Sequence, residues 1–167
     1  MSTSGTSQNA ESTEDIQIKP DKLTIVWSRD TRYWRMPPEN SDSPAELLQV
    51  RWLQVISSTD TNKLTAGKKY KIGFNVALTS DAFGWGPDSN ILVMAKIGDQ
   101  RPIKKVNLLE GDRQRNVRFD IPANLCIEAP PDASSSQEQL LFQLIGIRGG
   151  WKGGLKIYHA FITEVKQ

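Results

Sequence analysis

The chain has 167 residues, of which 38% are hydrophobic and 24% are charged, which is the composition of an ordinary soluble protein with one domain. Its net charge of +2 is too small to argue for nucleic-acid binding, and no apolar run approaches the ~20 residues that span a bilayer. With one histidine, His159, and one cysteine, Cys126, the sequence argues against a zinc site and a cysteine–histidine nucleophilic pair. We therefore expect a protein that is not an enzyme and needs no metal or cofactor.

The N-terminal segment is rich in Ser, Thr, Gln, Asn, Gly and Glu. It can bury too little apolar surface to offset chain entropy, so we predict a disordered tail over residues 1–19 and a single domain over residues 20–167. Ile16 and Ile18 could attach the end of the tail to the domain. The tail lacks the basic flank and apolar stretch of a signal peptide, which favours a cytoplasmic location and leaves nuclear access open.

The first strand is predicted over residues 23–27, and an unusual stretch follows it directly, Trp27-Ser28-Arg29-Asp30-Thr31-Arg32-Tyr33-Trp34. This stretch is too polar for a core and too aromatic for a simple linker, so we interpret it as a recognition surface. Tyr33 and Trp34 are the expected partners for stacking or hydrogen bonding. Trp27, at the strand end, is the member that we expect to be structural.

The next segment combines a helix signal with a strand signal. Ser43-Pro44-Ala45-Glu46 has the form of a capping box and could start one helical turn. The apolar run over residues 47–56 then indicates a strand, with Trp52 in the core. Residues 69–78 give the clearest strand, because apolar side chains alternate there with polar or small ones; the side chains on the apolar face are Tyr70, Ile72, Phe74, Val76 and Leu78.

Five further strand-like runs cover residues 91–97, 103–109, 115–121, 139–147 and 155–165, with turn residues between them. Eight short strands without a long helix predict an all-β sandwich or jelly roll.

Two more tryptophans lie in glycine-rich loops. Gly84 and Gly86 flank Trp85, whose indole we expect to project, and four glycines surround Trp151 and Lys152. The second loop could instead be a hairpin with Trp151 packed over it. An indole face can stack on the apolar C–H face of a sugar ring, while sugar hydroxyls need donors and acceptors, which these residues could supply: Arg29, Asp30, Arg32, Tyr33 and Lys152. Aromatic loops on a β-sandwich suggest a carbohydrate-binding module.

The order of these motifs resembles the plant phloem protein 2 family, also called the Nictaba-related lectins. The resemblance covers roughly residues 23–165. The matching motifs are Trp27-x-x-Asp30-x-x-Tyr33-Trp34, Ala45-Glu46-Leu47, Val50-x-Trp52-Leu53-x-Val55, Leu64-x-x-Gly67-x-x-Tyr70, Gly84-Trp85, and Gly150-Trp151-Lys152-Gly153-Gly154-Leu155-x-Ile157.

The resemblance implies an antiparallel β-sandwich of jelly-roll type that binds chitin oligosaccharides and glycoproteins carrying N-acetylglucosamine. It also implies a homodimer without enzymatic activity, located in the cytoplasm, the nucleus or the phloem sap. The family's sugar-binding tryptophans fall on Trp27 and Trp34. Its site glutamate has no direct counterpart in the strand before the last loop, where Glu138 is the nearest carboxylate, and the lysine run that acts as a nuclear signal in some relatives is reduced to Lys104-Lys105.

Two other functions remain open at this stage. Arg113, Arg115 and Arg118, with nearby aromatics, could bind RNA in a phloem transport protein. Sheet edges and Cys126 could instead build a structural phloem assembly. A buried or inert thiol is the preferred interpretation of Cys126.

Overall fold

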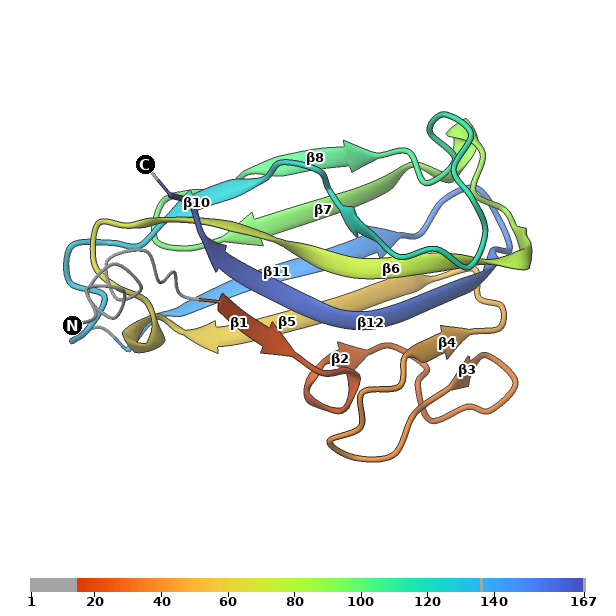
Figure 1. Cartoon of the computed structure of the whole chain (residues 1–167), viewed down its shortest axis with the longest axis horizontal. Coiled ribbons are helices and arrows are strands. Elements are labelled where there is room, and N and C mark those ends of the chain that lie inside the picture. The colour runs from red at the N-terminus through yellow and green to blue at the C-terminus, as the bar shows by residue number, and fades with distance from the viewer. Residues whose placement is uncertain (1–14, 136, 167) are drawn as a thin grey trace, which may run out of the picture.

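The computed structural model describes residues 15–135 and 137–166, which form two antiparallel sheets packed face to face (Figure 1). The seven strands of sheet A are β1 (Asp15–Ile18), β3 (Trp34–Arg35), β4 (Ala45–Leu47), β6 (Lys69–Phe83), β9 (Phe119–Ile121), β10 (Cys126–Glu128) and β12 (Gly153–Glu164). The five strands of sheet B are β2 (Thr24–Ile25), β5 (Leu53–Asp60), β7 (Ile91–Lys96), β8 (Ile103–Val106) and β11 (Gln139–Gly146). Short 3-10 helices lie in the connections: η1 (Pro20–Lys22), η2 (Thr61–Lys63) and η3 (Pro87–Ser89). The predicted antiparallel β-sandwich of jelly-roll type is confirmed.

The strand order makes the chain cross repeatedly between the sheets. Sheet A has the order β10-β6-β12-β4-β3, with β1 also paired to β12 and β9 to β6. Sheet B has the order β2-β5-β11-β7-β8. Because β2, β4, β6 and β11 are each followed by a strand of the opposite sheet, their connections lie at the ends of the sandwich rather than over its faces.

The core forms where the inner faces of the two sheets meet. The predicted apolar face of β6 is fully buried, from Tyr70 to Leu78. Across the sandwich, the ring of Phe74 lies 5.4 Å from that of Phe142 on β11. Burial of a large apolar side chain contributes roughly 1.5–3 kcal/mol, so this alternating pattern supplies much of the stability that fixes the loops at each end.

Two local predictions were wrong, because pairing with β12 overrides local signals. The capping box does not start a helical turn: Ala45–Leu47 form β4 and pair with Leu155–Ile157. The predicted disordered tail extends too far, since Asp15–Ile18 form β1 against Ala160–Thr163. Ile16 and Ile18 pack against the core, as expected. The remainder of the predicted tail, residues 1–14, lies outside the described residues.

The predicted strand over residues 47–56 is also interrupted. The chain leaves sheet A after Leu47 and enters sheet B at Leu53, and Trp52 in this crossing is 47% exposed rather than buried. Cys126, on β10, is likewise exposed, so of the preferred interpretation, a buried or inert thiol, burial is wrong. Within the described part of the chain, none of the helices is long and apolar enough to cross a membrane.

Candidate functional site

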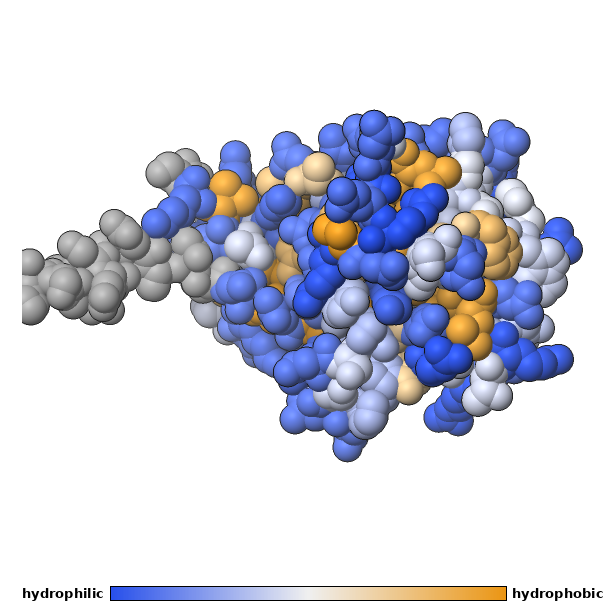
Figure 2. Space-filling model, turned by 45° about the vertical axis from the view of Figure 1, so that its right-hand side comes forward, coloured by the Kyte–Doolittle hydropathy of each residue, from blue (hydrophilic) through white to orange (hydrophobic). Residues whose placement is uncertain are grey.

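Four connections that cross between the sheets meet at one end of the sandwich, and each carries a tryptophan. They are residues 26–33, 48–52, 84–90 and 147–152, with Trp27, Trp52, Trp85 and Trp151 respectively. Val50 pairs with Lys152, and the amide of Leu48 donates to the carbonyl of Tyr33 (2.8 Å), so three of the crossings are neighbours. Figure 2 turns this end toward the reader and shows hydrophilic, intermediate and hydrophobic areas intermixed on it.

The crossing over residues 26–33 is a series of tight turns. Trp27 adopts a left-handed backbone with φ 71° in the turn directly after β2, which the amide of Ser28 closes by donating to the carbonyl of Ile25 (3.1 Å). The amide of Asp30 donates to the carbonyl of Trp27 (3.0 Å), and the amides of Tyr33 and Trp34 both donate to the carbonyl of Asp30 (2.9 and 3.1 Å). The loop is therefore held by its own backbone.

Asp30 and Arg32 form a fixed ion pair within this loop. The guanidinium of Arg32 donates twice to the Asp30 carboxylate, at 3.0 and 2.7 Å, and the Arg32 backbone amide donates to the same carboxylate at 3.0 Å. These hydrogen bonds, the side-chain ones above all, lower the pKa of Asp30 to about 2. Arg32 also lies 5.1 Å from the centre of the Tyr33 ring, so the charged pair and the aromatic surface are joined.

Trp27, Tyr33 and Trp151 form a row of three rings, called the aromatic cluster below. The rings of Trp27 and Tyr33 are 6.1 Å apart in an edge-to-face arrangement, and those of Tyr33 and Trp151 are 6.3 Å apart. Trp27 and Trp151 are 57% and 47% exposed, and Tyr33 is half-buried between them. Within the described residues, the Tyr33 hydroxyl has no hydrogen-bond partner. Indole faces and a phenol hydroxyl therefore face solvent together.

Beside the cluster, an open hollow of about 900 Å³ follows the outer side of the same loop. Its polar lining comes from Arg29, Asp30 and Arg32, and its apolar lining includes Trp27 and Ile25. Arg29 is exposed, so its five N–H donors face the hollow's mouth or solvent. This arrangement offers an apolar wall next to hydrogen-bonding groups, which suits a polar ligand with an apolar face.

The burial of Trp27 and Trp34 is the reverse of what their predicted roles require. Trp34 is only 1% exposed, because it enters β3 and pairs with Leu47 of β4 inside the core. Its buried Nε1–H has no hydrogen-bond partner among residues 15–135 and 137–166. The side chain that we expected to be structural, Trp27, is the exposed one, so Trp34 can support the loop but offers no face for stacking in this structure.

Trp85 was also expected to project, and it does not. It is 3% exposed, and its Nε1–H donates to the carbonyl of Gly153 at 2.8 Å. The flanking Gly84 has φ 86°, and a Cβ there would clash with the Trp151 carbonyl oxygen. The glycines thus let two crossings pack backbone against backbone, which covers Trp85.

Lys152, predicted to contact sugar, is fully buried. Its ammonium donates to the carbonyls of Arg51 (2.8 Å), Gly150 (2.9 Å) and Gly146 (3.2 Å). Burial, followed by the nearby charge of Arg51, lowers the pKa of Lys152. The side chain therefore ties two crossings together at the base of the site.

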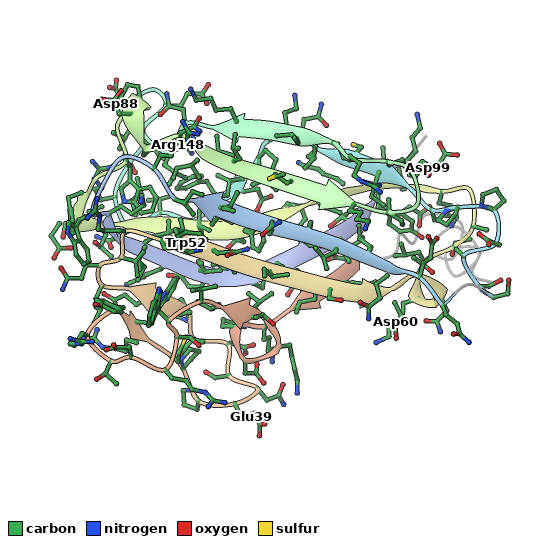
Figure 3. All side chains as sticks on the ribbon, turned by 180° about the vertical axis from the view of Figure 1, so that it is seen from behind. Glu39, Trp52, Asp60, Asp88, Asp99 and Arg148 are labelled. Carbon is green, nitrogen blue, oxygen red and sulfur yellow. The ribbon has the colours of Figure 1, made fainter. Side chains whose placement is uncertain are left out.

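Glu138 lies at the opposite end of the molecule. It precedes Gln139, which pairs with Asp60 at one end of β5, whereas Trp52 lies near the other end (Figure 3). The eight residues of β5 separate them by about 25 Å at ~3.3 Å per residue. Glu138 therefore takes no part in this site.

Sequence reasoning missed Trp52 as a surface residue. Leu53 and Val55 are buried, whereas Gln54 is half-buried on the outer face of sheet B. Because side chains alternate along a strand, Trp52 points to the same outer face as Gln54. That alternation was visible in the sequence, but the change of sheet just before Leu53 was not.

Comparison with known proteins gives a consistent set of relatives. A family model described as Phloem protein 2 matches residues 14–163. The chain is 36% identical over 158 residues to Protein PHLOEM PROTEIN 2-LIKE A9 of Arabidopsis thaliana, covering 88% of this chain and 86% of that one.

Two plant lectins are also similar. A lectin of Luffa acutangula is 36% identical over 68% of this chain, which spans about half (54%) of that lectin's length. A lectin of Coccinia grandis is 26% identical over 88% of this chain and 92% of its own. Among solved structures, a Caldicellulosiruptor saccharolyticus CBM27-1 in complex with mannohexaose aligns with a TM-score of 0.46 at 11% identity, over 90% of this chain and 97% of that one.

Proposed function

The chain belongs to the phloem protein 2 family, and we propose that it is a lectin whose aromatic cluster binds oligosaccharides containing N-acetylglucosamine. Lectins among its relatives support carbohydrate binding in general. The finer specificity for chitin oligosaccharides is our inference from the resemblance and from the chemistry of the cluster.

The observation that carries this proposal is the row of Trp27, Tyr33 and Trp151, brought together from two crossings far apart in the sequence. Two exposed indoles offer ring faces to the C–H groups of a pyranose. Such stacking needs no metal and no general base, which fits a binding protein better than an enzyme.

The polar groups beside the row suit the remaining parts of an N-acetylglucosamine unit. The hydroxyl of Tyr33 can accept or donate, and the exposed guanidinium of Arg29 supplies donors for hydroxyl or acetamido oxygens. Arg32 is already bound to Asp30 and lies over Tyr33. We therefore assign it the role of orienting the Tyr33 ring, not of contacting the ligand.

Calorimetric titration with N-acetylglucosamine oligomers tests the proposal. We expect chitotriose to bind and affinity to rise with oligomer length, because more rings can stack. If neither chitotriose nor longer oligomers bind at millimolar concentration, the proposed specificity is wrong. A glycan array run in parallel would show whether another sugar takes their place.

The alternative of RNA transport has weaker support from the arginines that suggested it. The guanidinium of Arg113 lies 3.7 Å from the Phe119 ring centre and that of Arg118 lies 3.9 Å from that of Tyr158. Arg118 also donates to the side chain of Asn75 at 2.6 Å. These arginines are occupied by the protein's own rings and amides, so aromatic stacking with bases would have to displace them. Binding through phosphates would weaken steeply with salt, and a flat salt response would rule out this function.

The family resemblance also leads us to propose a homodimer in phloem sap or cytoplasm, with nuclear entry open. Sedimentation measures the oligomeric state. Non-reducing electrophoresis of the native protein distinguishes a dimer held by surface contacts from an assembly linked through the exposed thiol of Cys126.

A further inference from the structure

A second aromatic surface lies on the outer face of sheet B, outside the aromatic cluster. The Nε1–H of Trp52 donates to Oε1 of Gln54 at 2.9 Å, which fixes the indole on the same face as that amide. Figure 3 looks onto this face and shows Trp52 near one end of β5. Because its only polar atom is already bonded within the protein, what Trp52 presents to a ligand is the apolar ring, 47% of the residue being exposed.

The amides next to Trp52 continue across the sheet. Nε2 of Gln54 donates to Oε1 of Gln143 on the neighbouring strand β11 at 2.8 Å. Because Oε1 of Gln143 accepts this hydrogen bond, the side chain of Gln143 keeps its two N–H donors for a ligand. Neither donor has a partner within the described residues. The row consists of one ring and two neutral amides, so it suits a neutral ligand that has an apolar face and hydroxyl groups.

Trp52 is joined to the aromatic cluster at its base. The ammonium of Lys152 bonds the Arg51 carbonyl, directly before Trp52, and the Gly150 carbonyl, directly before Trp151. One buried cation therefore positions the backbone of both indoles relative to each other. Among the described residues no ring contact links Trp52 to the cluster, so the two are separate platforms on one rigid base.

We propose that Trp52, with the amides of Gln54 and Gln143, is a further sugar subsite. It binds a pyranose unit of the same neutral oligosaccharide whose other units stack on the aromatic cluster. The inference rests on the proposed lectin function and extends it, because it makes the binding surface longer than the cluster and assigns the additional affinity for long oligomers to one side chain.

The test is calorimetric titration of the full chain with the trimer and the hexamer of N-acetylglucosamine. We expect Trp52→Ala to bind the trimer as the wild type does and the hexamer about fivefold more weakly, the size of one aromatic stacking contact. Trp52→Phe keeps a ring on the sheet and should restore most of the hexamer affinity. Ile103→Ala, which removes another exposed apolar side chain (54%) on the same sheet, is the matched control and should bind like the wild type.

Several results overturn the inference. An unchanged hexamer affinity in Trp52→Ala, or an equal loss for trimer and hexamer, shows that Trp52 forms no separate subsite. A change from dimer to monomer in Trp52→Ala, measured by sedimentation, shows that this face contacts another protein copy instead. If the wild type binds neither oligomer, the proposed lectin specificity fails first, and the subsite fails with it.

NMR of the indole N–H groups gives an independent reading. The five tryptophans give five indole signals, and Trp52→Phe identifies the one from Trp52 by its disappearance. We expect the Trp52 signal to shift with the hexamer and not with the trimer, whereas the Trp27 and Trp151 signals shift with both. A Trp52 signal that stays unmoved at saturating hexamer contradicts the subsite.

Discussion

The two crossings that build the aromatic cluster are held differently. The loop over residues 26–33 is fixed mostly from within, by backbone turns and by the bonds between Asp30 and Arg32. The glycine-rich crossing over residues 147–152 is fixed by contacts with two other crossings. Lys152 donates to the carbonyl of Arg51 in one of them, and Gly84 in the other packs against the backbone of Trp151.

In both regions, nevertheless, the crossing carries an exposed ring, and a buried side chain lies in the crossing or directly after it. Trp27 is exposed while Trp34 is buried, and Trp151 is exposed while its neighbour Lys152 is buried. From this difference in burial we expect some residues of a recognition motif to act by supporting the surface rather than by touching the ligand. Substitutions in both crossings can separate these two roles.

The largest effect is expected for Trp34→Ala. Removing this buried indole leaves a cavity, and we expect the free energy of unfolding to fall by about 3–5 kcal/mol, measured by urea denaturation. Trp34→Phe should cost much less, since it keeps a ring and also removes a buried Nε1–H that has no partner in the described part of the chain. Unchanged stability of Trp34→Ala with complete loss of sugar binding would contradict the supporting role.

Lys152→Met should be the next most damaging change. It removes the donor shared by the carbonyls of Arg51, Gly146 and Gly150, and we expect a loss of about 2–3 kcal/mol in the free energy of unfolding. Denaturation of Lys105→Met, which alters an exposed lysine, provides the control and should match the wild type. A Lys152→Met variant of wild-type stability would show that the two crossings hold together without the ammonium.

Trp27→Ala is expected to affect binding rather than folding. Because this side chain is 57% exposed, the free energy of unfolding should change by less than about 0.5 kcal/mol, while affinity for chitotriose falls about tenfold. Val117→Ala alters a side chain that is 50% exposed in another connection and should leave both quantities unchanged. Calorimetry measures the affinity and urea denaturation measures the free energy of unfolding of the same samples. A large loss of stability in Trp27→Ala would show that Trp27 is a structural residue.

The smallest effect concerns the pH dependence of the internally held loop. Hydrogen bonds from Arg32 lower the pKa of Asp30 to about 2 from 3.8, so the stabilisation from this carboxylate is fully present above about pH 4 and is lost as the pH falls through about 2. Protonation of Asp30 should therefore cause no change in sugar affinity between pH 8 and pH 5. An NMR titration of the Asp30 carboxyl that returns a pKa near 3.8 would show that the pair with Arg32 does not persist in solution.

The fold was predictable because its signal is local and repeated. Alternation along residues 69–78 identified the buried face of β6 from Tyr70 to Leu78. The position of the aromatic loop was also predictable, since no core strand tolerates so many charges beside aromatics. These features depend on neighbouring residues only.

The exposure of each tryptophan was not predictable in the same way. Trp27 is exposed in the turn that follows β2, where its backbone is left-handed, and Trp34 is buried because it pairs with Leu47. Trp85 is covered by Gly153, and Trp52 becomes exposed where the chain changes sheets. The exposures of Trp34, Trp85 and Trp52 depend on segments distant in sequence, which local patterns do not encode.

A crystal structure of the chain with chitotriose tests the central claim most directly. We expect pyranose rings to lie against the faces of Trp27 and Trp151, with a hydrogen bond to Tyr33 and no contact with Trp34, Trp85 or Lys152. Sugar bound elsewhere, for example in the polar hollow around His159 and Phe161 on sheet A, with the aromatic cluster empty, would contradict it.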